Sequence, residues 1–277
     1  MQKEDDYIHL LNIFVNILEA NKDIPADDKI LDAEGLARKC FFHAASLIYL
    51  LRSTNVPELS ISFFDPASIA VVARAAFESF LVFHYVFVEP TTEEQERFRY
   101  LLWKLADLME RQRYNALSPL GKAKQEQEKI LIEEIKDQIR QNQNYGQLQP
   151  KQQKAALEDR KWRFKSWTDI GLSAGLSEDY AKSCYRFVCS YAHAGSMSVL
   201  QLRQAETAEQ QKALCGATMA LTMISMAYFV KSYCLLFQKS KEFLKNNEEF
   251  SHHIKLWVEI GSIELKNVDV DWSKLSL

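Results

Sequence analysis

The sequence predicts an all-α protein, an antiparallel bundle of about six or seven main helices. Glycine and proline are scarce, with 8 and 6 copies in 277 residues, so few tight turns are available. Apolar residues recur at helical spacing through long segments. Residues 59–63 are the one stretch with the character of a strand. These observations exclude all-β and doubly wound folds, which need many more turns.

Three helices are expected in the first third of the chain, at about residues 6–20, 27–52 and 65–88. Prolines separate them, because proline cannot continue a helix. The third helix has the clearest start. Asp65 is a good N-cap residue, and Pro66 follows it at the first helical position.

The next two helices are predicted at about 91–116 and 118–142. Thr91 or Thr92 begins the first with a capping box, and Ser118 caps the second. The second helix is rich in Lys, Glu and Gln, so the pair is expected to project from the body as a polar hairpin.

Later helices are predicted after Ser177 and over about 206–246. We expect one helical domain over residues 1–250 and a C-terminal extension over 251–277 that is partly disordered.

Composition limits the function classes. The net charge of −3 gives no overall attraction to nucleic acid, so such binding would need a local basic patch. The five cysteines are widely spaced and suit a reduced, cytoplasmic protein, and no metal site or cofactor is predicted. Residues 66–88 and 213–230 are strongly apolar, but Arg74 and Glu78 lie at the centre of the first. We therefore expect core helices without membrane insertion.

Arg74 and Glu78 form the first candidate site. They are spaced i, i+4 and so face each other on an otherwise apolar helix. Because a lone buried charge is costly, the two should pair with each other or with a ligand. One interpretation is a ligand-binding site in the core, and the other is a structural ion pair.

Arg186 and His193 form the second candidate site. They lie seven residues apart, which is about two helical turns. In a catalytic interpretation, His193 takes a proton from a ribose 2′-hydroxyl and Arg186 holds the phosphate, with Ser190 and Tyr191 between them. In the alternative interpretation, Arg186 is a surface residue and His193 only ends its helix, where it interacts well with the helix dipole.

A third candidate site interleaves cations with aromatic rings, as single-stranded nucleic-acid surfaces do. Its predicted RNA-binding residues are Arg160, Lys161, Trp162, Arg163 and Lys165. The alternative is that the rings anchor a loop to the core while the charges point outward.

Two motifs resemble an uncharacterised bacterial family of all-helical proteins. One is Asp-Pro followed by Arg-x-x-x-Glu, matched by Arg74 and Glu78. The other is a later Tyr with Ser-x-x-His, matched by Tyr180 or Tyr185 and by Ser190 to His193. The architecture is in turn similar to the HEPN superfamily, whose signature is Arg-x₄₋₆-His. Phe187 stands where that signature often has a polar residue.

The resemblance implies a metal-independent endoribonuclease or RNA-binding protein of bacterial phage defence or stress response that acts as a homodimer. His193 would transfer the proton and Arg186 would clamp the phosphate. The second hypothesis is a non-catalytic helical module that binds a small ligand or a partner protein through Arg74 and Glu78.

Overall fold

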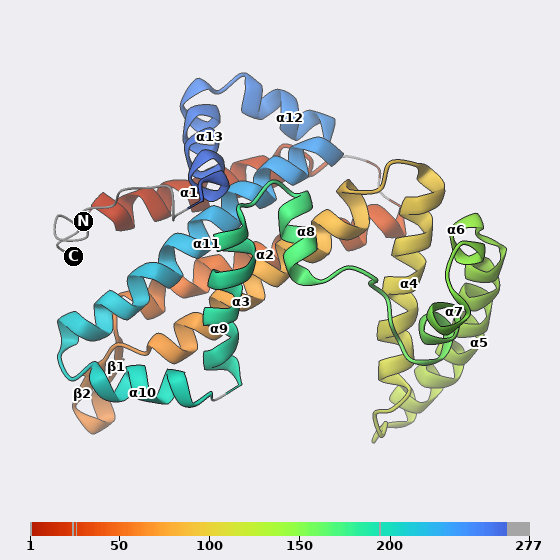
Figure 1. The fold of residues 1–277 in the computed structure, drawn as a ribbon, viewed down its shortest axis with the longest axis horizontal. Coiled ribbons are helices and arrows are strands. Elements are labelled where there is room, and N and C mark those ends of the chain that lie inside the picture. The colour runs from red at the N-terminus through yellow and green to blue at the C-terminus, as the bar shows by residue number, and fades with distance from the viewer. Residues whose placement is uncertain (1, 24, 26, 194, 265–277) are drawn as a thin grey trace. The chain divides into compact units, whose positions relative to one another are not determined.

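The computed structural model describes residues 2–23, 25, 27–193 and 195–264 of the chain (Figure 1). The predicted all-α class is confirmed. The described residues contain thirteen α-helices, and their one sheet is a two-stranded hairpin. The hairpin joins β1 (Thr54–Val56) to β2 (Ile61–Phe63), with Thr54 opposite Phe63.

The described residues group into two compact units. Unit 1 comprises residues 1–84 and 167–277, and unit 2 comprises residues 85–166. The helices of unit 1 are α1 (Gln2–Glu19), α2 (Asp28–Leu51), α3 (Pro66–Phe83), α8 (Trp167–Ser173), α9 (Tyr185–Ala192), α10 (Ser196–Gln204), α11 (Ala208–Leu236), α12 (Gln238–Lys245) and α13 (Glu248–Ser262). The helices of unit 2 are α4 (Glu93–Arg111), α5 (Pro119–Gln141), α6 (Gln143–Gly146) and α7 (Pro150–Glu158). Shorter turns are the 3₁₀ turn Pro57–Leu59 and the π-helical turns His84–Val88 and Asp179–Cys184.

Several helices begin where their capping residues predict. The Asp65 carboxylate accepts a hydrogen bond from the Ser68 amide at 3.0 Å, and Pro66 is the first residue of α3. Thr92 caps α4, and Ser118 caps α5. The predicted helix over 206–246 is instead divided. Phe237 has extended backbone angles and separates α11 from α12.

The core of unit 1 forms where α3 packs against α2 and α11, as Figure 1 shows. Aromatic rings fill it, and Phe83 and Phe229 lie with ring centroids 4.6 Å apart. Helix α1 adds fully buried Phe14 and Ile17 to the same core. Burial of such large side chains is the main stabilising contribution to a unit of this kind.

Unit 2 has a hydrophobic core of its own. Leu102 and Leu105 from α4 pack with Ile132, Ile135 and Ile139 from α5. The two helices that were expected to project as a polar hairpin therefore bury an apolar face within a compact unit. Only the outward face of α5 carries the polar composition seen in the sequence.

The domain boundaries also differ from those expected. One domain was predicted over residues 1–250, whereas the described residues form two units, one inserted into the other. The expected boundary at residue 250 falls inside α13, which packs on α11 and α12. The predicted disorder of the extension concerns residues 265–277, which lie outside the described residues.

Two helical segments are long and apolar enough to cross a membrane by length and composition. They are residues 66–88, with 61% of the apolar window buried within the protein, and α11, with 67% buried. Core helices pass the same test, and α3 and α11 form the centre of unit 1.

Candidate active site

Arg74 and Glu78 lie on one face of α3 and pair directly. The Arg74 Nε atom donates to Glu78 Oε1 at 2.8 Å. Their side chains are 22% and 29% exposed, so the pair sits at the surface of unit 1 and not in its core. The sequence predicted that the two residues pair, but it overestimated their burial. Most of the other residues of α3 are apolar, yet one side of the helix is accessible to solvent.

Helix α9 packs against α3 and adds two polar groups next to this pair. The Tyr185 hydroxyl donates to Glu78 Oε1 at 2.8 Å. At the other end of the helix, His193 Nε2 lies 3.2 Å from Arg74 Nη1. Arg74, Glu78, Tyr185 and His193 thus form one hydrogen-bonded group, called here the Arg–His cluster.

The donors and acceptors in this cluster can be assigned. A guanidinium carries only donors, so the nitrogen of His193 that faces Arg74 must be the acceptor. The lone pair of His193 Nε2 therefore points at the Arg74 guanidinium and accepts its hydrogen bond.

Two members of the cluster, Arg74 and Tyr185, have raised pKa values. Burial lowers the pKa of Arg74, but the hydrogen bond and the negative charge of Glu78 outweigh it and raise that pKa above its usual value. Burial raises the pKa of Tyr185, and hydrogen bonds with Glu78 and Cys189 raise it further. Tyr185 consequently remains a donor to Glu78 over the whole physiological range.

The other predicted residues of α9 lie outside the cluster. Arg186 is exposed, and within the described part of the chain it has no hydrogen bond or ion pair. The Ser190 hydroxyl donates to the carbonyl of Phe187, and the Tyr191 hydroxyl donates to Gln201 on α10. The cation beside His193 is therefore Arg74, from another helix, and not Arg186.

His193 also serves the structural role that the sequence allowed. It is the C-cap residue of α9, and its amide donates to the Cys189 carbonyl at 3.1 Å. The two interpretations of His193 are compatible, since the backbone ends the helix while the ring reaches Arg74.

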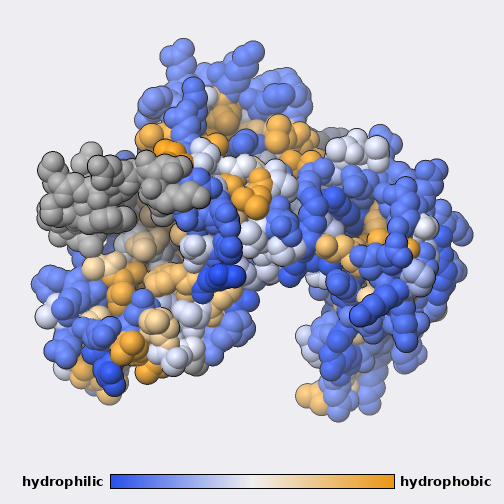
Figure 2. Space-filling view, viewed as in Figure 1, coloured by the Kyte–Doolittle hydropathy of each residue, from blue (hydrophilic) through white to orange (hydrophobic). Residues whose placement is uncertain are grey.

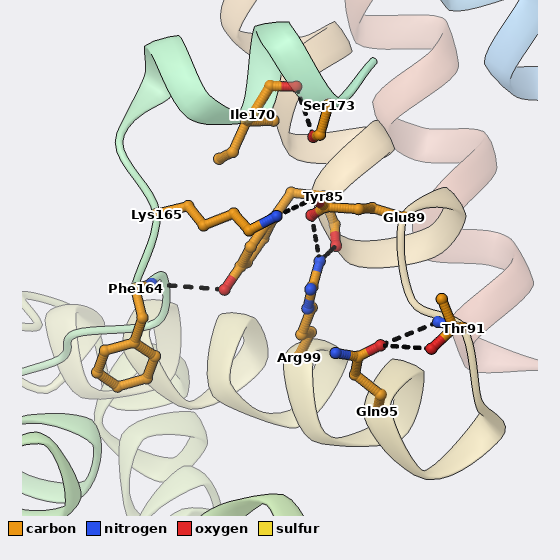
Figure 3. Close-up of polar contacts among 9 residues, drawn as sticks. All are labelled: Tyr85, Glu89, Thr91, Gln95, Arg99, Phe164, Lys165, Ile170 and Ser173. Atoms are coloured by element: carbon orange, nitrogen blue, oxygen red, sulfur yellow. Dashed lines mark hydrogen bonds and ion pairs between the residues drawn. The ribbon is translucent and has the colours of Figure 1, made fainter. Parts of the chain in front are cut away.

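The predicted RNA-binding segment belongs to unit 2, where an ion-pair network anchors it (Figure 3). Lys165 pairs with Glu89, which also accepts from Arg99 Nη1 at 2.5 Å. Arg99 donates in addition to the Tyr85 carbonyl at 2.8 Å and lies over the Tyr85 ring. Lys165 is thus bound by a carboxylate.

Two further members of this segment face inward. Arg160 pairs with Glu110, and Trp162 packs against the core of unit 2. Arg163 donates to the carbonyl of Lys165 at 2.5 Å. The packed ring of Trp162 agrees with the interpretation in which the segment anchors a loop, but Arg160, Arg163 and Lys165 are bound within unit 2 and do not simply point outward.

The surface that follows His193 in sequence is apolar. Met197 and Val199 on α10 are 57% and 58% exposed, and Leu59 and Ile61 of the β1–β2 hairpin are also exposed. Figure 2 shows orange areas over α10 and the hairpin. A cavity of about 340 Å³ lies along α10 and is lined by Ser196, Met197, Val199, Leu200 and Arg203.

A model described as a family of unknown function, DUF5677, matches residues 33–211, well over half of the chain. The chain belongs to the DUF5677 family. No curated protein and no solved structure matches it significantly. The DUF5677 region includes every residue of the Arg–His cluster and all of unit 2, whereas α12 and α13 lie beyond it.

Sequence reasoning identified three members of the cluster but not their grouping. Within the DUF5677 region, 119 residues separate Arg74 from His193, so only the packing of α9 on α3 unites them. Tyr185 was part of a motif without a role. Its spacing offered a signal, because Tyr185, Cys189 and His193 recur every four residues and lie along one side of a helix. Among the described residues, no group of three or more His, Cys, Asp or Glu could hold a metal ion.

Proposed function

We propose that this protein is a metal-independent endoribonuclease of the HEPN-like kind, with the Arg–His cluster as its active site. The observation that carries the proposal is the 3.2 Å contact between Arg74 Nη1 and His193 Nε2. It joins a proton acceptor to a phosphate-binding cation at a solvent-accessible position. The proposal transfers the role of phosphate clamp from Arg186 to Arg74.

The cluster supplies what RNA cleavage without a metal needs. When a substrate phosphate draws Arg74 Nη1 away from His193, the freed Nε2 lone pair accepts the proton of a ribose 2′-hydroxyl, and the 2′-oxygen attacks the adjacent phosphorus. The bond from phosphorus to the 5′-oxygen breaks, and that oxygen takes a proton from water. The products are a 2′,3′-cyclic phosphate and a 5′-hydroxyl end.

Arg74 has further N–H groups that can donate hydrogen bonds to the phosphate. Its Nε atom binds Glu78 and its Nη1 atom meets His193, while Nη2 has no hydrogen bond within the described residues. Donors fixed in advance beside developing negative charge contribute strongly to catalysis. Glu78 and Tyr185 act as positioning residues, since they hold the guanidinium and do not reach the substrate.

Two further expectations remain part of the proposal. Lys161 is the one cation of the basic segment that is exposed, and we assign it to contact with the RNA backbone. Homodimerisation would cover the exposed side chains of Met197 and Val199 beside the site.

The test is cleavage of single-stranded RNA in EDTA by the purified protein and its variants. We expect cyclic-phosphate ends, and about a hundredfold or greater loss in His193→Ala, the size of a general-base contribution. Arg74→Ala should lose about as much. Arg186→Ala should stay within a few-fold of the wild type, as should the half-buried control Lys182→Ala, which lies outside the cluster.

Three outcomes would contradict the proposal. Cleavage that survives His193→Ala would indicate a contaminating nuclease. Loss of activity in Arg186→Ala with retention in Arg74→Ala would return the clamp to Arg186. Absence of cleavage by the wild type would favour the other hypothesis, a binding module that uses Arg74 and Glu78 without chemistry.

A further inference from the structure

A separate cavity of about 400 Å³ lies in unit 1, within the usual size range of small-molecule sites. It is formed by the end of α1, the first half of α2 and the residue that joins α11 to α12. The cavity is lined by Val15, Leu18, Glu19, Asn21, Lys22, Ile30, Leu31, Glu34, Arg38, Phe41, Phe42 and Phe237. None of these residues belongs to the Arg–His cluster.

Asn21 lines this cavity, and its side-chain amide is held in one orientation. The residue is 5% exposed, and its Nδ2 atom donates to Tyr233 at 3.1 Å and to Ser240 at 2.8 Å. Tyr233 donates its own proton to Glu34, and Ser240 donates to the carbonyl of Ile17. Both hydroxyls must therefore accept from Asn21, which fixes the orientation of the amide.

The fixed amide has its oxygen on the opposite side from these hydroxyls. Asn21 Oδ1 is fully buried and has no hydrogen-bond partner among the described residues. A buried polar atom without a partner is costly, and such atoms are rare in folded proteins.

Glu34 adds a negative charge to the same cavity. Its Oε1 atom accepts the Tyr233 proton, and no hydrogen bond to its Oε2 atom occurs in the part of the chain that the structure describes. The carboxylate is an acceptor with a negative charge, so this part of the cavity favours N–H donors with a positive charge.

The rest of the lining combines apolar and aromatic side chains with the charged side chains of Glu19, Lys22 and Arg38. Phe41, Phe42 and Phe237 supply three rings, whose faces attract cations as well as apolar groups. Lys22 lies 3.7 Å from Glu19, so these two lining charges largely offset each other. Arg38 is exposed.

We propose that this cavity binds a small primary ammonium or amidinium compound with an apolar body. The cationic head donates to Glu34, and the body packs on the phenylalanine rings. The inference goes beyond the proposed function, because it concerns other residues and requires no chemistry. It would stand even if the protein cleaved no RNA.

The test is a pair of probes with the same ring and opposite charge. Binding of 2-phenylethylamine and of 3-phenylpropionate to the full chain is followed by protein-detected NMR titration. We expect saturable shifts with the amine at millimolar concentration or below, and none with the carboxylate.

Glu34→Gln is the decisive variant. It retains an oxygen that accepts from Tyr233 but removes the charge, so the amine should bind about tenfold more weakly or worse. Glu259→Gln on α13 is the matched control, because this exposed carboxylate does not line the cavity, and the affinity should stay within about twofold. If Glu34→Gln fails to fold, Phe42→Ala replaces it, because Phe42 is 61% exposed and its loss should weaken amine binding without disturbing the core.

Equal binding of the two probes would overturn the proposal, since the charge would then play no part. Unchanged affinity in a folded Glu34→Gln would overturn it as well. So would the absence of any shift with the amine at lining residues such as Phe41 and Glu34.

Discussion

At the scale of single residues, the Arg–His cluster depends on Glu78. Its Oε1 atom accepts from both Arg74 and Tyr185, so one carboxylate orients the cation and joins α3 to α9. Because the pair is about a quarter exposed, its contribution to stability should lie between those of surface and buried ion pairs.

We expect Glu78→Ala to lower the free energy of unfolding by about 1–3 kcal/mol, since Arg74 and Tyr185 both lose their acceptor. Chemical denaturation measures the loss. The control is Glu259→Ala on α13, which removes an exposed i, i+4 partner of Lys255 and should cost less than about 0.5 kcal/mol. Equal losses in the two variants would mean that the Glu78 contacts are as weak as a solvated pair.

The sequence identified the residues of this cluster better than their arrangement. The i, i+4 spacing of Arg74 and Glu78 is enough to predict their pairing. Which cation meets His193 is set by how α9 lies on α3, and no local pattern encodes that contact. Arg186 seemed the natural partner because it is near in the chain, but proximity in sequence is a poor guide to contact across helices.

At the scale of helices, the junction of α1 and α13 contains two histidines. The rings of His9 and His253 lie with centroids 4.6 Å apart. Burial, and then the charge that His9 can carry, lower the pKa of His253 below its usual 6.5, although Asp6 acts in the opposite direction. The folded protein therefore disfavours the protonated form of His253.

This lowered pKa predicts a loss of stability in acid. Above pH 6.5 the folded and unfolded states both hold a neutral His253, and its contribution to stability is complete. As the pH falls further, the unfolded state takes up a proton that the folded state resists, so the unfolding free energy falls. His43 has a lowered pKa too and acts in the same direction.

The measurement is Tm at about pH 7.5 and about pH 5.5. The fall in Tm between the two should be smaller in His253→Gln than in the wild type. His252→Gln, a change at the exposed neighbouring residue, should reduce the fall less than His253→Gln does, because the charge of His252 is the last of the causes that lower the pKa of His253. An equal fall in all three proteins would exclude His253 as the source.

The sequence predicts a helix boundary correctly where a side chain caps the helix. It does not predict a boundary that depends on tertiary packing. Asp65, Thr92 and Ser118 each cap the helix that their position predicts. Phe237, by contrast, separates two helices without proline or glycine, and its ring packs 4.3 Å from that of Tyr233. Tertiary contacts rather than local propensity fix such a break.

At the scale of the whole molecule, two compact units share one chain. The existence of unit 2 was not predicted, because residues 117–150 are mostly polar and the apolar stripe that α5 buries is narrow. Ile132, Ile135 and Ile139 recur at helical spacing, but a short apolar stripe does not distinguish a hairpin packed on a separate core from one that projects into solvent.

Separate cores predict separable stability. Ile139 is fully buried in unit 2, so Ile139→Ala should cost about 2–5 kcal/mol there. Hydrogen exchange should show lost protection in α4 and α5, with α3 and α11 unchanged. Ile17→Ala, a fully buried position of unit 1, should give the reverse pattern. A uniform loss in either variant would mean that the units unfold together.

Unit 1 is built from two segments of the chain that unit 2 separates in sequence, and this order affects folding during synthesis. Helix α3 leaves the ribosome long before α11, the helix that covers it, because all of unit 2 is translated between them. The strongly apolar α3 cannot pack against α11 until α11 has been synthesised, and such delayed pairing slows folding and promotes aggregation. The growing chain is therefore a natural client for chaperones that bind exposed apolar segments during translation.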